Sequence, residues 1–421
     1  MSMKQAATAL SVDEARRRIL ETCLDRRMPI EQVALEEARL RVAGKDIVAP
    51  RDLPPFANSA MDGFALRGAD LPSDGTRRLR IAGTRLAGSA HELSIGPGEC
   101  ARITTGALLP AGADTVVIKE RVRVEGETAI VQVGETVGAH VRPAAEDFRA
   151  GETVVQAGER ITFARMAAIA SVGLATVEVS CRPRVTLLTT GDELVMPGHT
   201  CSLAQIYNSN GYSLSAMLAM SGVRQIAAGA TDTGAGFGHL GDDVGRIRDA
   251  LSAAAEQGDA IITSGGVSVG EADYLPRLVG ELGRIHFWKV RMRPGMPFLF
   301  GEIGKALVFC LPGNPVSTMA TFLALVGPGL AAMQGSRNPL PRMHSAKLAS
   351  AIRKSHDRTE FLRARVEVDD EGICRAWPLA GQGSAMLRGV VEANGLVVVP
   401  ESTRELDSGE MVTVMPLPDC P

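Results

Sequence analysis

Apolar and polar positions alternate most clearly in the middle of the chain, between Arg184 and about Met333. Four apolar runs occur there: VTLLTT, DAIITS, IHFWKV and ALVFCLP. Stretches with helical periodicity separate them, near 209–220, 243–257, 272–282 and 316–326. Buried strands that alternate with helices are typical of βαβ units. The pattern therefore predicts a parallel sheet with helical connections.

Three further helices are expected before this region. Ser11, followed three positions later by Glu14, is a capping-box signature at the start of an apolar-periodic run, which predicts a helix that ends before Pro29. A second helical run is predicted from Glu31 to Arg41, and a short helix from about Phe163 to Ser171.

The segments on either side of the middle region have the sequence pattern of β-strands. From about Asp46 to Val155, short alternating runs are broken by Pro and Gly, which is the pattern of a small all-β domain. Short β runs return from about 340 to 421. We therefore expect two β-rich parts around an α/β core.

Length and charge narrow the functional classes. A chain of 421 residues suggests about three domains, and 45% hydrophobic residues can form real cores. The formal net charge is −3 and only 4% of residues are aromatic. Because nucleic-acid-binding proteins need basic surfaces and stacking aromatics, we expect no nucleic-acid partner.

Cysteine spacing and the N-terminal segment bear on location. The seven cysteines include no C-x-x-C pair, which argues against a zinc ribbon or a disulfide framework and favours a reducing compartment. The first residues contain no apolar segment typical of a secretory signal. The uncharged stretch from Ala306 to Ser336 is broken by Pro and Gly, so it is interpreted as strand, loop and buried helix. We expect a cytoplasmic protein with no membrane association.

Unusual loops follow three of the predicted strands. Ligands of open α/β sheets bind beyond the carboxyl ends of the strands, where glycine N–H groups, hydroxyls and helix N-termini can hold an anion. Acidic residues in these loops, Asp192, Glu193 and Asp273, suit a Mg²⁺ ion that neutralises a phosphate. The loops favour a phosphorylated ligand, with ordinary tight turns as the alternative for each one alone. The loop residues that we assign to ligand binding are Thr190, Gly191, Asp192, Ser264, Gly265, Gly266, Ser268, Pro312, Gly313, Asn314, Pro315 and Ser317.

Three cations alternate at the end of the strand IHFWKV and just beyond it: Lys289, Arg291 and Arg293. Functionally, they form an anion clamp beside the crevice, and we assign Lys289 and Arg293 to ligand binding. The alternative is a solvated strand edge whose charges prevent aggregation.

Other motifs compete with this interpretation. Residues 266–270 match G-x-S-x-G, which would make Ser268 the nucleophile of a serine hydrolase. Residues 236–241 fit G-x-G-x-x-G, but the next strand ends in Ser264 where a dinucleotide site needs an acid. A Walker A loop is absent, and no histidines have a metal-ligand spacing such as H-E-x-x-H.

Seven motifs, taken together, resemble one family strongly: the molybdopterin molybdenumtransferases, or MoeA and gephyrin E-domain family. They occur in family order across nearly the whole chain. They are NSAMDGFA (58–65), ITTGA (103–107), TTGDELV (189–195), QIYNSN (205–210), TSGGVSVGEADY (263–274), RPGMPF (293–298) and LPGNPVS (311–317).

The resemblance implies an α/β multidomain fold. Its centre is a three-layer α/β/α domain with a mostly parallel sheet, accompanied by a β-rich insertion domain, a discontinuous N-terminal domain and a C-terminal β-barrel. We expect the N-terminal domain at 1–48 plus 148–182, the β-rich domain at 49–147, the molybdopterin-binding domain at 183–335 and the barrel at 336–421.

The resemblance also implies a reaction and partners. Molybdate enters the dithiolene of molybdopterin-AMP with the help of Mg²⁺, AMP leaves, and molybdenum cofactor forms. A homodimer is implied, and molybdopterin adenylyltransferase and molybdoenzyme-maturation proteins are the expected partners.

Site residues carry over from the matching motifs. Metal and phosphate are expected at Glu193, Asp232 and Asp273. Arg293, Arg363 and Ser384 resemble the residues of the family's oxyanion site, which holds molybdate. The catalytic set consists of Asp62, Thr105, Asp147, Glu193 and Asp273, of which the first three would complete the cleft across the dimer interface.

One departure from the family keeps a second function open. The family usually has Lys-Pro-Gly-Lys-Pro where this chain has Arg293 and Met296, so one cation of the molybdate pocket is lost. The alternative functions are a paralogue that binds molybdopterin or partner proteins without insertion chemistry, and the serine hydrolase at Ser268.

Overall fold

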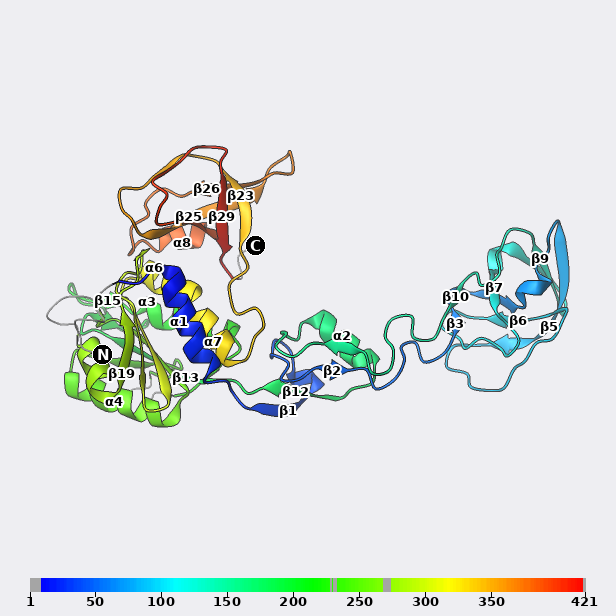
Figure 1. The fold of residues 1–421 in the computed structure, drawn as a ribbon, viewed down its shortest axis with the longest axis horizontal. Helices are drawn as coiled ribbons and strands as arrows, with labels where there is room; N and C mark the ends of the chain where they lie inside the picture. The colour runs from blue at the N-terminus through cyan, green and yellow to red at the C-terminus, as the bar shows by residue number, and fades with distance from the viewer. Residues whose placement is uncertain (1–8, 228, 230–232, 268–273, 419–421) are drawn as a thin grey trace.

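The computed structural model describes residues 9–227, 229, 233–267 and 274–418. Figure 1 shows an elongated molecule: an α/β domain and a barrel lie at one end, a β-rich domain lies at the other, and a slender segment connects them. This arrangement agrees with the expected multidomain fold class.

The central sheet has the strand order β16-β13-β18-β22-β21-β19, and β17 pairs with β13. Its strands are β13 (Arg184–Thr190), β16 (Arg224–Gln225), β17 (Gly238–Leu240), β18 (Ala260–Ser264), β19 (Arg284–Trp288), β21 (Leu299–Ile303) and β22 (Ala306–Leu311). The pairings of β13 with β16, β17 and β18, and of β18 with β22, are parallel. The sheet is therefore mostly parallel, as expected.

Strand β21 departs from the predicted parallel pattern, because it pairs antiparallel with β19 on one side and with β22 on the other. The predicted run IHFWKV forms β19, which therefore runs in the same direction as β22. The cause is the tight turn at Gly304 and Lys305 between β21 and β22, because so short a connection joins only antiparallel strands. Strand β21 is not among the four strands predicted from the apolar runs.

Two layers of helices cover the sheet. Along β22, Leu307 and Phe309 face one core together with α1, whereas Val308 and Cys310 face a second core with α4 and α5. This alternation confirms the three-layer architecture. The helices are α3 (Ser209–Met220), α4 (Val244–Gln257), α5 (Leu275–Leu282), α6 (Pro315–Thr321), a π-helical turn (Phe322–Val326) and α7 (Gly327–Met333).

Helix α1 (Val12–Leu24) begins where the sequence predicts. The Ser11 hydroxyl accepts a hydrogen bond from the Glu14 N–H at 3.1 Å, which caps the helix. Its buried face, including Ile19 and Cys23, belongs to the core of the α/β domain, and α1 lies against α7 in Figure 1. This helix therefore packs with the central domain, although in sequence it lies at the N-terminal end, more than 150 residues before that domain's first strand, β13.

The connecting segment is built from two two-stranded sheets and a helix. They are β1 (Ile30–Ala34) with β12 (Thr176–Ser180), β2 (Ile47–Val48) with β11 (Thr153–Val155), and α2 (Phe163–Ser171). The helix predicted at 31–41 is wrong: the chain forms β1 and a single 3₁₀ turn, Leu35–Glu37. Pairing with β12, more than a hundred residues later in sequence, outweighs the local helical propensity.

The β-rich domain contains a six-stranded sheet with the order β7-β4-β6-β5-β9-β8. Its strands are β4 (Gly63–Leu66), β5 (Thr76–Arg85), β6 (Glu99–Ile103), β7 (Thr115–Ile118), β8 (Val122–Glu125) and β9 (Thr128–Gln132), and the pair β3 (Asn58–Ser59) and β10 (Val141–Arg142) lies beside it. Two 3₁₀ turns, Gly68–Asp70 and Lys119–Arg121, complete the domain.

The C-terminal region closes into a five-stranded barrel. The pairings run from β25 to β26, β23, β29, β27 and back to β25. The strands are β23 (His344–Leu348), β25 (Thr359–Val368), β26 (Cys374–Pro378), β27 (Gly395–Val399) and β29 (Met411–Pro416), with β24 (Ile352–Arg353), β28 (Glu405–Leu406) and α8 (Arg388–Glu392) around them. Strand β20 (Met292–Arg293) of the central region pairs with β25, which ties the barrel to the α/β domain.

One helical stretch, Pro315–Met333, is long and apolar enough to cross a membrane by length and composition. Of its most apolar window, 78% is buried inside the protein. This is the burial of a core helix, in agreement with the sequence interpretation of 306–336.

Candidate functional site

A cavity of about 1080 Å³ lies at the carboxyl ends of β13, β18 and β22, between the α/β domain and the barrel. This is where ligands of open α/β sheets bind. Thirteen of the predicted site residues line it: Thr190, Gly191, Glu193, Ser264, Gly265, Gly266, Arg293, Pro312, Gly313, Asn314, Pro315, Ser317 and Ser384.

Glycine is required in the cavity floor. Gly265 has a φ of +103°, and a Cβ there would lie 2.6 Å from the Thr190 carbonyl oxygen. A side chain would be both strained and in collision with backbone. The floor can therefore present its backbone to a ligand only with glycine at 265.

Two asparagines that the sequence analysis did not assign individually hold these loops together. Asn210 is 9% exposed, and its Nδ2 donates to Ser264 Oγ at 2.9 Å and to the Gly313 carbonyl at 2.7 Å. Asn208 caps α3, since its Oδ1 accepts from the Gly211 N–H at 3.1 Å. Both line the cavity, and an Asn before a helical run is the signal that could have identified Asn208.

A polar acceptor remains open at this point. The buried Asn210 Oδ1 has no hydrogen-bond partner among the described residues, and Asn210 lines the cavity. Buried polar atoms are normally paired, so the atom is suited to accept a hydrogen bond from a bound ligand.

Among the described residues, two carboxylates line the cavity, Glu193 and Asp242. Asp242 accepts a hydrogen bond from the Tyr274 hydroxyl, and burial, with Asp242 as the next cause, raises the pKa of Tyr274 above its usual value. The phenol therefore stays protonated and donates. Asp192 does not line the cavity: its Oδ1 accepts from the Asp242 N–H at 3.0 Å, so its carboxylate positions the neighbouring loop.

Three predicted residues, Asp232, Ser268 and Asp273, lie outside the described residues. Glu193 and Asp242 are oxygen ligands of the kind that Mg²⁺ prefers, and they share the cavity with the glycine floor. The described residues thus supply two carboxylates of the kind the expected ion prefers, but no group of three His, Cys, Asp or Glu side chains that could hold a metal ion.

The predicted cations have different environments. Arg293 lines the cavity, and its Nη1 lies 3.4 Å from Oε1 of the buried Glu360. Lys289 does not line it, and its Nζ lies 4.8 Å from the Trp288 ring centroid. Arg291 pairs with Glu401 at 2.9 Å. The three cations therefore do not act as one clamp.

Arg363 is 1% exposed and does not line the cavity. Its guanidinium donates to the carbonyls of Gly381, Gly383 and Met386 at 2.8–3.1 Å. These bonds hold the loop that carries Ser384, whose Oγ accepts from Asn314 Nδ2 at 3.0 Å. In this structure Arg363 shapes the cavity wall.

Two of the predicted residues of the β-rich domain, Asp62 and Thr105, are hydrogen-bonded to each other. Asp62 Oδ1 accepts from the Thr105 N–H at 2.8 Å and from its hydroxyl at 2.9 Å. These bonds, the backbone one first, lower the pKa of Asp62, so it stays ionised. Asp147 lies 3.4 Å from Arg142.

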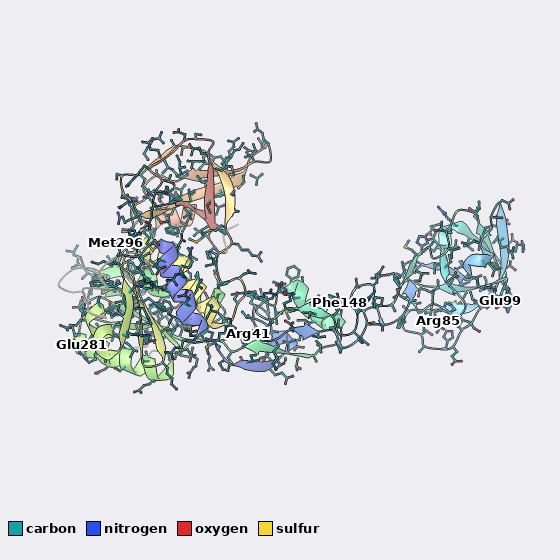
Figure 2. All side chains as sticks on the ribbon, in the orientation of Figure 1. Arg41, Arg85, Glu99, Phe148, Glu281 and Met296 are labelled. Carbon is teal, nitrogen blue, oxygen red and sulfur yellow. The ribbon has the colours of Figure 1, made fainter. Side chains whose placement is uncertain are left out.

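These parts of the β-rich domain are far from the cavity within one chain. Figure 1 places β3, β10 and β6 at the end of the molecule opposite α3 and α6. Figure 2 shows the same separation, with Met296 at the cavity end, Arg85 and Glu99 in the β-rich domain, and Phe148 between them. One copy of the chain does not bring the two groups together.

Comparison with known proteins gives one result along the whole chain. Residues 10–173 match the MoeA N-terminal region (domain I and II), residues 186–332 the probable molybdopterin binding domain, and residues 345–417 the MoeA C-terminal region (domain IV). The molybdopterin molybdenumtransferase of Haemophilus influenzae is 34% identical over 409 residues, 97% of this chain and 98% of the relative. Gephyrin of Dictyostelium discoideum is 31% identical over 95% of this chain and 61% of its own length.

A solved structure has the same overall architecture. The molybdopterin biosynthesis MoeA protein of Pyrococcus horikoshii matches with a TM-score of 0.77 and 30% sequence identity, over 97% of this chain and 99% of that one. From motif order, fold and these similarities together, the chain belongs to the molybdopterin molybdenumtransferase (MoeA) family.

Proposed function

We propose that this chain inserts molybdenum from molybdate into adenylylated molybdopterin and releases AMP, with Mg²⁺ as the metal. As a member of its family, the chain is a transferase of molybdenum cofactor biosynthesis. The observation that carries the finer proposal is the cavity itself, where the glycine floor, carboxylates and a cation meet at the carboxyl ends of the strands.

The residues present suggest a division of tasks. The floor at Gly265 and Gly266 and the loop at Gly313 offer backbone and hydroxyl groups to the nucleotide-pterin. Arg293 lines the cavity and can donate hydrogen bonds to an anion there. The phosphoanhydride is cleaved when a water or molybdate oxygen attacks the phosphorus of the molybdopterin phosphate: a new P–O bond forms, the bond to the bridging oxygen breaks, and AMP departs with that oxygen. The two dithiolene sulfurs bond to molybdenum, and one oxygen of molybdate leaves as water with the two thiol protons. Mg²⁺, when bound, would neutralise phosphate charge, and Glu193, Asp232 and Asp273 would hold it.

The proposed assembly is a homodimer. Its support is the separation within one chain: Asp62, Thr105 and Asp147 can meet the cavity only if a second copy supplies them. We further propose a cytoplasmic location, and molybdopterin adenylyltransferase and molybdoenzyme-maturation proteins as partners, from the resemblance alone.

One observation favours a second candidate, a paralogue that binds molybdopterin or partner proteins without insertion chemistry. Met296, which donates no hydrogen bond, lines the cavity where the family usually has lysine. The hydrolase at Ser268 is not proposed, because Ser268 lies outside the described residues and the relatives above carry transferase names.

AMP release decides between the candidates. The purified protein is mixed with adenylylated molybdopterin, with or without molybdate, Mg²⁺ and a chelator. The transferase releases AMP only when molybdate and Mg²⁺ are both present, and Met296→Lys changes the apparent KM for molybdate. If the wild type binds the ligand but releases no AMP, and Met296→Lys restores AMP release, the chain is instead the paralogue without insertion chemistry.

A further inference from the structure

Arg358 is a cavity residue that neither the sequence analysis nor the family motifs singled out. It stands directly before β25 and lines the cavity near Arg293. The parallel pairing of β20 with β25 brings the two arginines to one wall, since Arg293 is in register with Glu360.

The backbone around Arg358 is held firmly. The Arg358 N–H donates to His356 Nδ1 at 3.3 Å, and its carbonyl accepts from Lys354 Nζ at 2.9 Å. Lys354 is 6% exposed and also donates to the Glu401 carbonyl. The loop is therefore fixed by a buried lysine whose donors go to backbone oxygens.

The guanidinium of Arg358 differs from those of its neighbours. It forms no ion pair or hydrogen bond within residues 9–227, 229, 233–267 and 274–418 and is half-buried. By contrast, the charge of Arg293 is shared with Glu360, and Arg363 is bonded to carbonyls. The uncompensated positive charge at this wall is therefore that of Arg358.

An uncompensated, partly desolvated guanidinium on a fixed loop is suited to a tetrahedral oxyanion, because its fork of N–H donors matches two oxygens at once. Met296 in the same lining has no side-chain donor, so Arg358 and Arg293 are the cationic side chains of the described residues that line the cavity. We infer that Arg358 binds an oxygen pair of a tetrahedral oxyanion in this cavity, either molybdate or a phosphoryl group of the molybdopterin nucleotide; the identity of the anion rests on the proposed function.

The test compares wild type with Arg358→Gln and Arg358→Lys. Arg353→Gln is the matched control, since Arg353 is an exposed arginine of the same region that pairs with Asp407 at 2.7 Å. Equilibrium dialysis measures the Kd of molybdate alone, calorimetry measures the Kd of AMP, and AMP-release kinetics give the KM for each substrate. Thermal unfolding of each variant controls for folding.

Arg358→Gln should weaken one anion roughly 10- to 100-fold, the range for a lost charge-assisted hydrogen bond. Arg358→Lys should recover part of it, and Arg353→Gln none of the loss. Weaker molybdate binding supports the inference and names molybdate; weaker AMP binding alone supports it and names the phosphoryl group. Unchanged affinity for both, in a folded Arg358→Gln protein, overturns it.

Failure of the proposed function has a different signature. A wild type that binds molybdate and AMP but releases no AMP in the full reaction contradicts the transferase activity. The dialysis and calorimetry results for Arg358→Gln still decide the role of Arg358 in that case.

Discussion

Glu302, on β21 next to the edge strand β19, lies beside three basic side chains. His286 Nε2 lies 3.5 Å from its carboxylate, Arg284 3.0 Å and Arg26 3.4 Å. The imidazole stacks on Phe300 with ring centroids 5.0 Å apart. Burial lowers the pKa of His286 below its ordinary value, although Glu302 opposes this shift.

This shift predicts a pH dependence of stability. Below an ordinary pKa of about 6.5, the unfolded chain takes up a proton at His286 that the folded protein resists, so the free energy of unfolding falls as pH falls. His286→Gln should therefore flatten the decline between about pH 7 and 5, measured by urea unfolding at a series of pH values. The exposed His344→Gln is the control, and an equal slope in His286→Gln and wild type would contradict the prediction.

Residue types in the site could be predicted from sequence, but not their partners. Loop residues such as Gly265 and Ser264 follow strand ends, and strand ends of a parallel sheet meet at one edge. From the sequence alone, Lys289, Arg293 and Arg363 are equally plausible as cations that donate hydrogen bonds to a bound anion. Only the folded chain places Glu360 beside Arg293 and three carbonyls around Arg363, because those partners come from other strands and loops.

At the scale of elements, α1 is the clearest case of a segment whose stability depends on distant packing. Ile19 is fully buried between α1 and α7, and a Cβ on Gly329 of α7 would lie 2.8 Å from its Cγ2. Such close packing leaves little room for the core to relax after truncation.

Ile19→Ala should therefore lower the free energy of unfolding of the central domain by about 2–5 kcal/mol. Leu24→Ala, on the same helix but 38% exposed, should cost no more than about 0.5 kcal/mol. Urea unfolding followed by the fluorescence of Trp288, on β19, reports on this domain when the other tryptophan, Trp377 of the barrel, is replaced in all variants by Trp377→Phe. Equal midpoints for the two variants would show that α1 is not part of the core.

Elements with a local signal could be predicted well, and those defined by long-range pairing could not. Residues 163–171 carry the apolar periodicity of α2, and Asn208 caps the apolar run 209–220 that forms α3, so both helices have local signals at their observed bounds. The run 31–41 contains residues of good helical propensity, yet its strand partner β12 is remote in sequence. Propensity therefore gives the wrong element where tertiary pairing decides.

At the scale of the whole molecule, the order of β-rich and α/β segments along the sequence indicates the domains but not the distance between them. The β-rich domain is inserted between β2 and β11, so both of its connections enter the same slender segment. Its distance from the cavity follows from how that segment is oriented, which depends on packing at the α/β domain. No local pattern encodes that orientation.

That separation leads to a prediction about assembly. Asp62→Asn removes the carboxylate that Thr105 holds in the β-rich domain, and Glu193→Gln removes a cavity carboxylate at the other end of the chain. If the site is shared between copies, each variant alone should lose most of its AMP-release activity, because every site of its homodimer lacks one group.

Mixing the two variants after reversible dissociation distinguishes the arrangements. In a mixed dimer, one site combines the intact cavity of the Asp62→Asn chain with the intact β-rich domain of the Glu193→Gln chain, whereas the other site carries both changes. Random pairing makes half of the dimers mixed, so about a quarter of wild-type activity should return. A site formed within one chain would be damaged in both variants alike, and mixing would restore nothing. The control for exchange mixes wild type with a chain that carries both Asp62→Asn and Glu193→Gln. With a shared site, each mixed dimer then has one change in each of its two sites, so both sites should lose activity.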